Sequence, residues 1–291
     1  MNRLIKYNIK KYILFCVFTA TIGVLLLSCN WSEHKNEKLQ FKPVLNQVYH
    51  FSFTKNRIQS WTYQTVPYSV YDTVQMDFSL QKINSKGTPD TCKFTLHSFT
   101  WKGKAKVDYH RDSLHALSIN IIISDSGKIE AVQNMNNLTQ DIIKDSSTGK
   151  YLSGLIPDHV SSSAITDMLT RFFSVIPGKK VKPNETWITN TTLSTNHPVN
   201  FSNFNRLISR SGDTADIEIQ SNIFARRSPG DEYYIKGNQN GEALINYSTG
   251  ILYSYKTKSE TITTTSYYDI KVDEDISLLQ MDKQIKLDKK N

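Results

Sequence analysis

The chain is poor in cysteine and lacks the short motifs that mark common enzyme classes. Its three cysteines are Cys16, Cys29 and Cys92. No His-Glu-x-x-His, Gly-x-Ser-x-Gly or P-loop pattern occurs in the sequence. His110 and His115 have no cysteine partner nearby, so their spacing predicts a solvated loop rather than a zinc site. We therefore expect a protein that is not an enzyme and that has no cofactor and no metal centre.

The sequence also has only one long hydrophobic run, which lies near the N-terminus. Residues 1–11 carry four basic and no acidic side chains, and the 16 residues that follow, 12–27, form an apolar run interrupted by Thr19, Thr21 and Gly23. Leu26-Leu27-Ser28-Cys29 matches a lipobox, the cleavage site of a bacterial lipoprotein signal. A membrane-spanning anchor is the alternative, but such a helix usually needs about 20 apolar residues. The pattern predicts a signal peptide over residues 1–28 and lipidation of Cys29.

The residues beside Cys29 predict where the lipid holds the protein. Asn30 is not the aspartate that retains enterobacterial lipoproteins in the inner membrane, and no acidic run follows it. We therefore expect an outer-membrane lipoprotein that faces the periplasm and is anchored in the membrane through acylated Cys29. Cleavage lowers Lys plus Arg from 35 to 31 against 27 acidic residues, so the net charge falls from +8 to +4. This small charge gives no support for nucleic-acid binding.

From about residue 45 onward, apolar and polar residues alternate. Period two predicts strands with one buried face, and glycine turns such as Asp125-Ser126-Gly127 predict antiparallel hairpins. Cys92 belongs to one such run, so we expect a buried thiol without an intramolecular disulfide. Further strands are predicted between Trp187 and Val272. The apolar positions of the first runs are Tyr49, Phe51, Phe53, Val74, Met76, Phe78 and Leu80.

The periodicity changes to that of a helix in the middle of the chain. Apolar residues recur at i, i+3, i+4 and i+7, with Asp158 and Ser161 as capping candidates. We expect this stripe to pack on the sheet, and a second, short helix over Met135–Ile143. The residues of the stripe are Ile165, Met168, Leu169, Phe172, Phe173 and Ile176.

Strands followed by helices and then by more strands predict an α+β fold. We expect a long-stranded, curved antiparallel sheet, a half-barrel, packed around one or two helices. The chain divides into a signal peptide (1–28), a lipidated tether (29–45), a single domain (46–272) and a charged tail (273–291).

A basic loop follows the long helix. Pro177-Gly178 and Pro183-Asn184 are favourable pairs for tight turns, because Gly and Asn accept a positive φ. Lys179, Lys180 and Lys182 lie between these two turns. The loop is either the joint between a helix and a strand, or a surface that contacts anionic headgroups or a partner.

Three local patterns carry a family resemblance over residues 45–272. They are Gly127-Lys128-Ile129, Phe173-x-x-x-Pro177, and Asn184-Glu185-Thr186-Trp187, in which Asn replaces the usual Gly. The chain thus resembles a family of uncharacterised envelope lipoproteins of Bacteroidota, classed as a domain of unknown function. The resemblance implies kinship with the lipoprotein-carrier fold, a half-open barrel closed by helices around an apolar cavity. It brings no catalytic residues.

Two functions follow, and the sequence leaves both open. The first is non-catalytic binding of an apolar or amphipathic ligand between sheet and helix, with a fully packed core as the rival state. The second is a structural or interaction subunit that docks on another envelope protein through exposed Tyr-rich strands. The candidate lining residues for the first are Tyr49, Phe51, Phe78, Phe94, Met168, Phe172 and Phe173. Ser113 and Thr214 lie in short Asp-Ser/Thr patterns that make them glycosylation candidates.

Overall fold

The structure of the protein is a computed structural model, whose described part belongs to one compact unit, Lys38–Asn291. It describes residues 38–84, 89–103, 106–110, 117–133, 160–193, 198–226, 234–265 and 267–281, with backbone alone for 106–110 and 117. The predicted signal peptide and Cys29 lie outside these ranges. Within them, no helix combines the length and the hydropathy needed to cross a bilayer.

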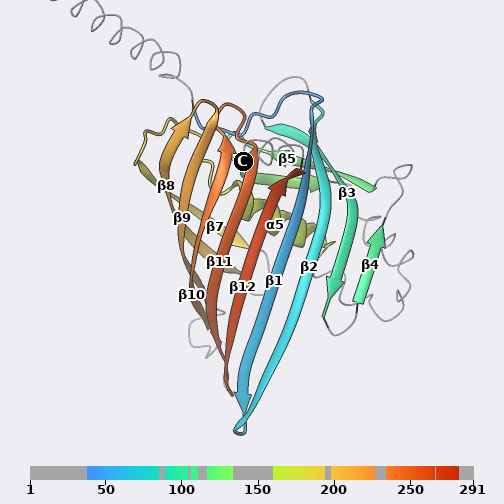
Figure 1. The fold of residues 1–291 in the computed structure, drawn as a ribbon, viewed down its shortest axis with the longest axis vertical. Coiled ribbons are helices and arrows are strands. Elements are labelled where there is room, and N and C mark those ends of the chain that lie inside the picture. The colour runs from blue at the N-terminus through green and yellow to red at the C-terminus, as the bar shows by residue number, and fades with distance from the viewer. Residues whose placement is uncertain are drawn as a thin grey trace, which may run out of the picture. The chain divides into compact units, whose positions relative to one another are not determined.

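Figure 1 shows a large sheet with the helix α5 (Ser162–Phe173) on one side. All strand pairings are antiparallel, in the order β6-β5-β3-β2-β1-β12-β11-β10-β9-β8-β7, with β4 beside β3. The first and last strands, β1 and β12, pair at the centre of the sheet. The strands are β1 (Val48–Tyr63), β2 (Val66–Lys82), β3 (Asp90–Lys102), β4 (Lys106–His110), β5 (Leu117–Ile123), β6 (Ile129–Gln133), β7 (Thr186–Leu193), β8 (Val199–Ser211), β9 (Thr214–Arg226), β10 (Tyr234–Asn246), β11 (Leu252–Thr264) and β12 (Asp269–Gln280).

The predicted α+β class is wrong, because the fold is almost entirely sheet. Among the described residues α5 is the only helix element, and it has 12 residues. The antiparallel strands are longer than the apolar alternation predicts, and β1 and β2 reach 16 and 17 residues. The reason is that polar residues such as Arg57 and Asp72 continue the alternation on the same face. The second predicted helix, Met135–Ile143, lies outside the described residues.

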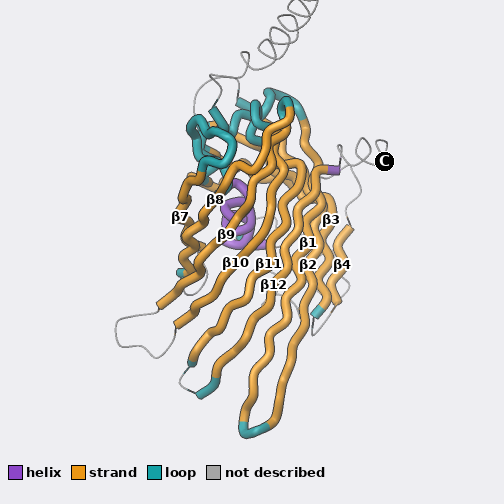
Figure 2. The backbone as a smooth tube through the Cα atoms, turned by 60° about the vertical axis from the view of Figure 1, so that its left-hand side comes forward, coloured by secondary structure: helices purple, strands orange, loops and turns teal. Residues whose placement is uncertain are grey.

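Short turns and close backbone contacts shape the sheet. Gly212 and Gly250 turn the chain at φ 57° and 68°, as the sequence predicts for glycine turns. In β10, a Cβ on Gly241 would lie 2.1 Å from the carbonyl oxygen of Lys256, so only glycine fits there. Figure 2 shows the strands running together past α5, with the β1–β2 turn at the far end. We call this turn the tip, the face toward α5 the inner face, and the opposite face the outer face.

The helix α5 follows its sequence pattern. Ser161 is the N-cap, and its Oγ accepts a hydrogen bond from the Ala164 N–H at 3.1 Å. The ring of Phe172 lies 5.7 Å from that of Phe53 in β1 and 5.2 Å from that of Tyr255 in β11. The predicted packing of the helix stripe is therefore confirmed. The buried residues of the stripe are Ile165, Met168, Leu169, Phe172, Phe173 and Ile176.

Both ends of the predicted domain extend further than the sequence indicates. Leu39 and Phe41, placed in the tether by the sequence, are buried, and the Phe41 ring lies 4.9 Å from that of Phe173. The Leu39 N–H donates to the Lys179 carbonyl at 3.0 Å. Residues 273–280, placed in the charged tail, belong to β12, where Ile276 faces the core. The strand was missed at residues 273–280 because charged residues there obscure the alternation of apolar and polar positions.

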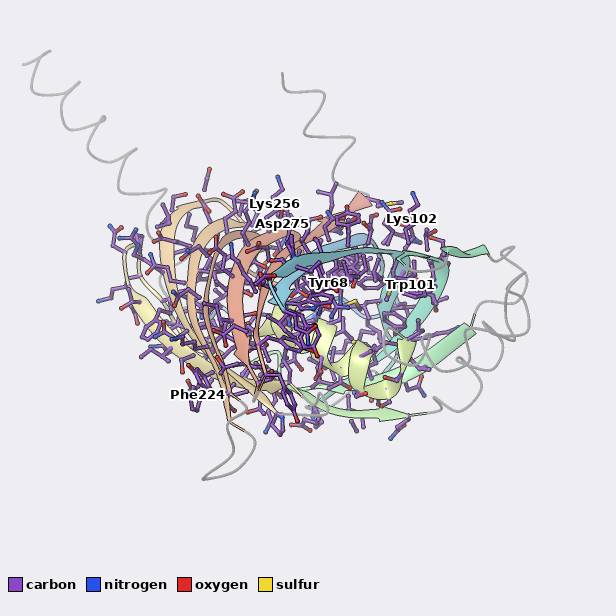
Figure 3. All side chains as sticks on the ribbon, turned by 90° about the horizontal axis from the view of Figure 1, so that it is seen from below. Tyr68, Trp101, Lys102, Phe224, Lys256 and Asp275 are labelled. Carbon is purple, nitrogen blue, oxygen red and sulfur yellow. The ribbon has the colours of Figure 1, made fainter. Side chains whose placement is uncertain are left out.

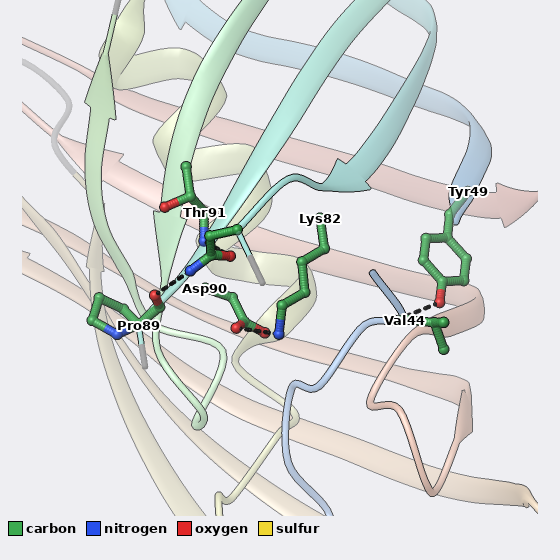
Figure 4. Close-up of polar contacts among 7 residues, drawn as sticks. Val44, Tyr49, Lys82, Pro89, Asp90 and Thr91 are labelled. Carbon is green, nitrogen blue, oxygen red and sulfur yellow. Dashed lines mark hydrogen bonds and ion pairs between the residues drawn. The ribbon is translucent and has the colours of Figure 1, made fainter. Parts of the chain in front are cut away.

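Polar contacts fix the end of the sheet opposite the tip (Figure 4). Lys82 and Asp90 form an ion pair at 2.5 Å, and the Val44 N–H donates to the hydroxyl of Tyr49 at 3.1 Å. Cys92 lies next to this ion pair in β3 and is 1 % exposed. Burial, with a smaller contribution from Asp90, raises the pKa of its thiol to about 12. The prediction of a buried, unpaired thiol is confirmed.

Candidate functional site

The inner face carries a continuous row of polar residues across eight neighbouring strands. In an antiparallel sheet, residues paired in register share a face. Following the register from β7 to β2 gives a polar side chain at every step, with no apolar residue between. We call this set the polar row: Thr189, Asn203, Ser221, Gln239, Ser259, Glu274, Arg57 and Asp72.

The half of the polar row on β7 to β11 is uncharged. The Ser221 hydroxyl donates to Asn203 Oδ1 at 2.7 Å, and Gln239 Nε2 donates to Ser221 at 3.4 Å. At the edge, the Thr189 hydroxyl donates to the carbonyl of Ser174, just after α5, at 2.7 Å. Asn203 and Ser221 are each 3 % exposed, and the bond between them pairs polar groups that are costly to bury alone. The buried Gln239 Oε1 has no hydrogen-bond partner among the described residues.

The half on β12, β1 and β2 is charged. Arg57 donates to Asp72 Oδ2 from Nε at 2.8 Å and from Nη2 at 2.5 Å. Arg171, from the last turn of α5, donates to Glu274 Oε1 at 2.6 Å. Lys55 lies one inner position above Arg57, in register with Ile276 and Val74. Three cations and two carboxylates therefore meet on the inner face.

Burial and neighbouring charges shift the pKa values in this cluster. Burial alone would raise the pKa of Glu274, but Arg171 and then Lys55 overcome it and hold that pKa at about 2. Burial lowers the pKa of Lys55, while Glu274 opposes the shift. Burial likewise raises the pKa of Tyr255, which faces the same cluster. At neutral pH both members of the Arg171–Glu274 pair are thus charged.

Between the polar row and the tip, the inner face of β1, β2 and β12 becomes apolar again but stays partly open, whereas on β7 to β9 Leu193, Phe201 and Ile223 form a second buried cluster. Its half-buried residues include Val70 and Val272, one inner position below Asp72 and Glu274. Farther down, the ring of Trp61 stacks on that of Tyr68 at 5.6 Å, and Tyr68 is 44 % exposed. Figure 3 shows Tyr68 on the side of the sheet that faces α5. We call the inner residues from Val70 to the tip, with their partners on β12, the lower inner surface.

The seven predicted ligand-lining residues lie elsewhere, in the main hydrophobic cluster. They are at most 8 % exposed, and three of them form a stack in which Phe78 lies 5.3 Å from Phe51 and 4.9 Å from Phe94. The structure thus brings these side chains together as packed core. The full set is Tyr49, Phe51, Phe78, Phe94, Met168, Phe172 and Phe173.

The lysines of the predicted contact loop are exposed, and the carboxylate of Glu185 fixes the conformation of the loop. Lys179 forms an ion pair with Glu185 at 3.2 Å, and the Lys182 N–H donates to the other oxygen of Glu185 at 2.9 Å. Asn184 adopts φ 63°, and its N–H donates to the Leu207 carbonyl at 2.6 Å. These contacts are those of a joint between α5 and β7. A role of Lys179, Lys180 and Lys182 in surface contact stays a prediction.

The remaining candidates concern modification. Thr214 is half-buried at the start of β9, directly after the turn at Gly212. Ser113 and Cys29 lie outside the described residues. Glycosylation and lipidation therefore stay predictions.

A hollow of about 750 Å³ lies over β1, β10, β11 and β12, lined mostly by outer-face residues. Figure 3 shows two of its residues, Lys256 and Asp275, on the outside of the curve. Asp275 also lies 3.7 Å from Lys258 in an exposed ion pair. Such exposed pairs contribute little binding energy, so we place the functional site on the inner face instead.

The sequence contains a signal for the polar row, because charged residues continue the apolar runs of two strands. Lys55 and Arg57 continue the inward positions of Phe51 and Phe53, and Glu274 precedes Ile276 by two residues. Charged residues in register with a buried face are expensive to place there, so they mark a special site. Their partners come from distant segments, and no spacing rule predicts that Arg171 reaches Glu274.

The fold and the site define an open antiparallel-sheet protein whose inner face has two apolar surfaces separated by polar side chains. The chain belongs to a family of unknown function, DUF6263, whose model matches residues 71–252. No curated protein matches the chain.

Two solved structures show a distant likeness to this chain. One described as "Lipid-protein interactions in lipovitellin" shares 9 % identity and a TM-score of 0.45, over 81 % of this chain and 25 % of that chain. This chain therefore spans about a quarter of the lipovitellin chain. The translocator domain of the autotransporter NalP from Neisseria meningitidis gives 7 % identity and a TM-score of 0.21, over 93 % and 98 % of the chains. At these TM-scores the likenesses carry no argument about function, and they do not confirm the resemblance to lipoprotein carriers.

Proposed function

We propose that the protein binds an amphipathic ligand on the lower inner surface, with the polar end of the ligand at the polar row. The observation that carries this proposal is the order of side chains along neighbouring strands. From the tip upward, β1 presents Trp61, Gln59 and Arg57, and β12 presents Ile270, Val272 and Glu274 in register with them. An apolar surface that leads to charged groups matches a molecule with an apolar chain and a polar head.

The exposure of the two inner surfaces supports this placement. Phe53 and Phe172, above the polar row, are 5 % and 1 % exposed and fill their own space. Val70, Val272 and Ile270, below it, remain half-buried within the described part of the chain. Burying partly exposed apolar groups under a ligand chain is favourable, at about 25 cal/mol per Å² of apolar surface.

Native mass spectrometry of the full-length protein, extracted in mild detergent, tests the proposal. We expect a co-purified amphiphile on the wild-type protein and its loss in Val272→Asp, which places a charge on the lower inner surface. Ile262→Asp is the matched control, because Ile262 lies on the outer face of the neighbouring strand and is 39 % exposed. An equal bound mass on both variants, or none on the wild type, contradicts the proposal.

A second candidate function, docking on another envelope protein, is favoured by the tip. Trp61 stacks with Tyr68 at 5.6 Å and with Tyr268 at 6.5 Å, while Tyr63 and Tyr267 are 46 % and 86 % exposed. Residues 58–70 contain no charged side chain. Exposed aromatic clusters are common anchors in protein interfaces.

Crosslinking in intact membranes separates this candidate from ligand binding. A stoichiometric protein partner that is lost in Tyr68→Ala and retained in Phe224→Ala supports docking through the tip. Phe224 is a suitable control because it is 53 % exposed on the outer face of β9 (Figure 3). No crosslinked partner on the wild-type protein contradicts docking.

Both functions fit a lipoprotein of the bacterial outer membrane, anchored through Cys29 and facing the periplasm. The support for this part of the proposal is the lipobox Leu26-Leu27-Ser28-Cys29. Metabolic labelling with an alkyne fatty acid should mark the wild-type protein and leave Cys29→Ser unlabelled. Equal labelling of the two proteins contradicts acylation at this cysteine.

A further inference from the structure

The charged cluster formed by Arg57, Asp72 and Glu274 of the polar row together with Lys55 and Arg171 has one more cation than it has carboxylates. The cations are Lys55, Arg57 and Arg171, and the carboxylates are Asp72 and Glu274. Each carboxylate is already held by an arginine, Asp72 by Arg57 and Glu274 by Arg171. Within the described part of the chain, Lys55 forms no ion pair, and so its charge is the surplus one.

The place of Lys55 makes this surplus costly. It is half-buried on the inner face between Val74 and Ile276, whose side chains are buried and apolar. An ammonium group removed from water favours any anion that reaches it, because the low polarity of its surroundings strengthens their attraction. Burial also lowers the pKa of Lys55, in keeping with this environment.

Neither arginine donates all of its N–H groups to its carboxylate. The side chain of Arg57 is 32 % exposed, and Nε and Nη2 both donate to the same oxygen of Asp72. The guanidinium keeps further N–H donors on Nη1. The other oxygen, Asp72 Oδ1, is buried and has no hydrogen-bond partner among the described residues. The cluster therefore retains both donors and an acceptor for a bound molecule.

The uncharged residues of the polar row offer no cation to a bound anion. Asn203, Ser221 and Gln239 are each 3 % exposed and bond to one another. An anion that travels up the lower inner surface would thus meet its first cations on β1, at Arg57 and then Lys55. This order along one strand follows from the register with β12 and β2.

We propose that Lys55, with Arg57 and Arg171 beside it, binds the anionic head group of an amphiphile, a carboxylate or a phosphate. The inference rests on the proposed function, because it requires that the apolar chain of the ligand lies on the lower inner surface. The head group enters first, and its negative charge offsets the surplus positive charge of the cluster. The same chemistry would also accept a free phosphate, so the test separates the two sources.

Calorimetric titration of the full-length protein with dodecanoate, dodecanol and inorganic phosphate tests the inference. We expect the wild type to bind dodecanoate at least tenfold more tightly than dodecanol. Lys55→Met should remove this preference by weakening dodecanoate binding about tenfold, and should leave dodecanol binding unchanged. Lys55→Arg, which keeps the positive charge, should retain the preference for dodecanoate over dodecanol. Lys258→Met is the control, because Lys258 is 83 % exposed on the outer face.

The outcomes separate the inference from the function on which it rests. Equal affinity for dodecanoate and dodecanol in the wild type, or equal loss of both in Lys55→Met, overturns the anion seat and leaves amphiphile binding standing. Phosphate binding that is lost in Lys55→Met, without binding of either dodecyl compound, supports the seat and rejects the amphiphile. Binding of none of the three overturns both. Unchanged thermal unfolding of Lys55→Met shows that the variant is folded.

Discussion

The inner face above the polar row and the lower inner surface belong to the same strands, yet only the first is filled. Above the row, α5 covers the sheet, and Phe172 contacts both Phe53 and Tyr255. Below it, Val272 and Ile270 continue the same alternation on β12 but remain half-buried. The difference shows that alternation defines a face of a sheet, whereas a second layer decides whether that face becomes core.

The largest effect is expected from removing a ring above the polar row. Phe172→Ala should lower the free energy of unfolding by about 3–5 kcal/mol, because it leaves a cavity between α5 and the sheet. Urea unfolding followed by circular dichroism measures the change. A loss below about 1 kcal/mol would mean that the upper region is as open as the lower one, and the comparison would fail.

The polar row, which separates the two regions, should make the free energy of unfolding depend on pH. The pKa of Glu274 is about 2 in the folded protein and ordinarily 4.5. Because the folded value is the lower one, the stabilisation is complete above about pH 5 and is lost as the pH falls from 4.5 towards 2. A shift of this size corresponds to about 3 kcal/mol. Unfolding of the wild type and of Glu274→Gln between pH 2 and 7 should show a shallower fall for the variant; parallel curves would contradict the pairing with Arg171.

A smaller effect is expected from loosening the helix that makes the upper region closed. Ser161→Ala removes the side-chain oxygen that accepts the Ala164 N–H at the start of α5. Loss of an N-cap costs about 1 kcal/mol. Thermal unfolding should report this loss, and Ser161→Asp, which keeps an acceptor, should restore it. If Asp gave no recovery, the cap would not be what holds the helix over the sheet.

The smallest effect on stability is expected on the lower inner surface. Val272→Ala should change the free energy of unfolding by less than about 1 kcal/mol, because the side chain is only half-buried in the absence of a ligand. The same substitution should weaken the retention of a bound amphiphile, as read by native mass spectrometry. A loss of stability as large as that of Phe172→Ala would show that the lower surface is already packed core.

The sequence predicted the local elements better than their assembly. The α5 stripe and its cap at Ser161, the turn at Gly127 and the buried thiol of Cys92 each depend on neighbouring residues, and the structure has them as expected. The fold class failed because polar inward residues such as Arg57 hid the continuation of the strands. The pairing of β1 with β12 joins opposite ends of the domain, and local periodicity contains no information about it.

The site escaped prediction for a related reason. Phe78 and Phe94 were identified as inward-facing from their alternation, but alternation alone does not distinguish a cavity lining from a filled core. The polar row requires the register of eight strands, and each residue in it is an ordinary strand residue by itself. Lys55 and Arg57, next to the apolar run of β1, and Glu274, two residues before Ile276, are the positions that could have raised a question from the sequence.

The length of the β1–β2 hairpin has a mechanical consequence. The chain joins the sheet at the start of β1, where the Asn46 N–H donates to the Lys82 carbonyl at 3.0 Å. The turn at Gln64 and Thr65 lies a full strand away, and 16 residues at about 3.3 Å each span about 50 Å. Because both strands are bonded into the sheet, this distance is that of a rigid spacer. The aromatic turn is therefore held at a fixed distance from the start of β1, whatever the length of the chain that precedes the sheet.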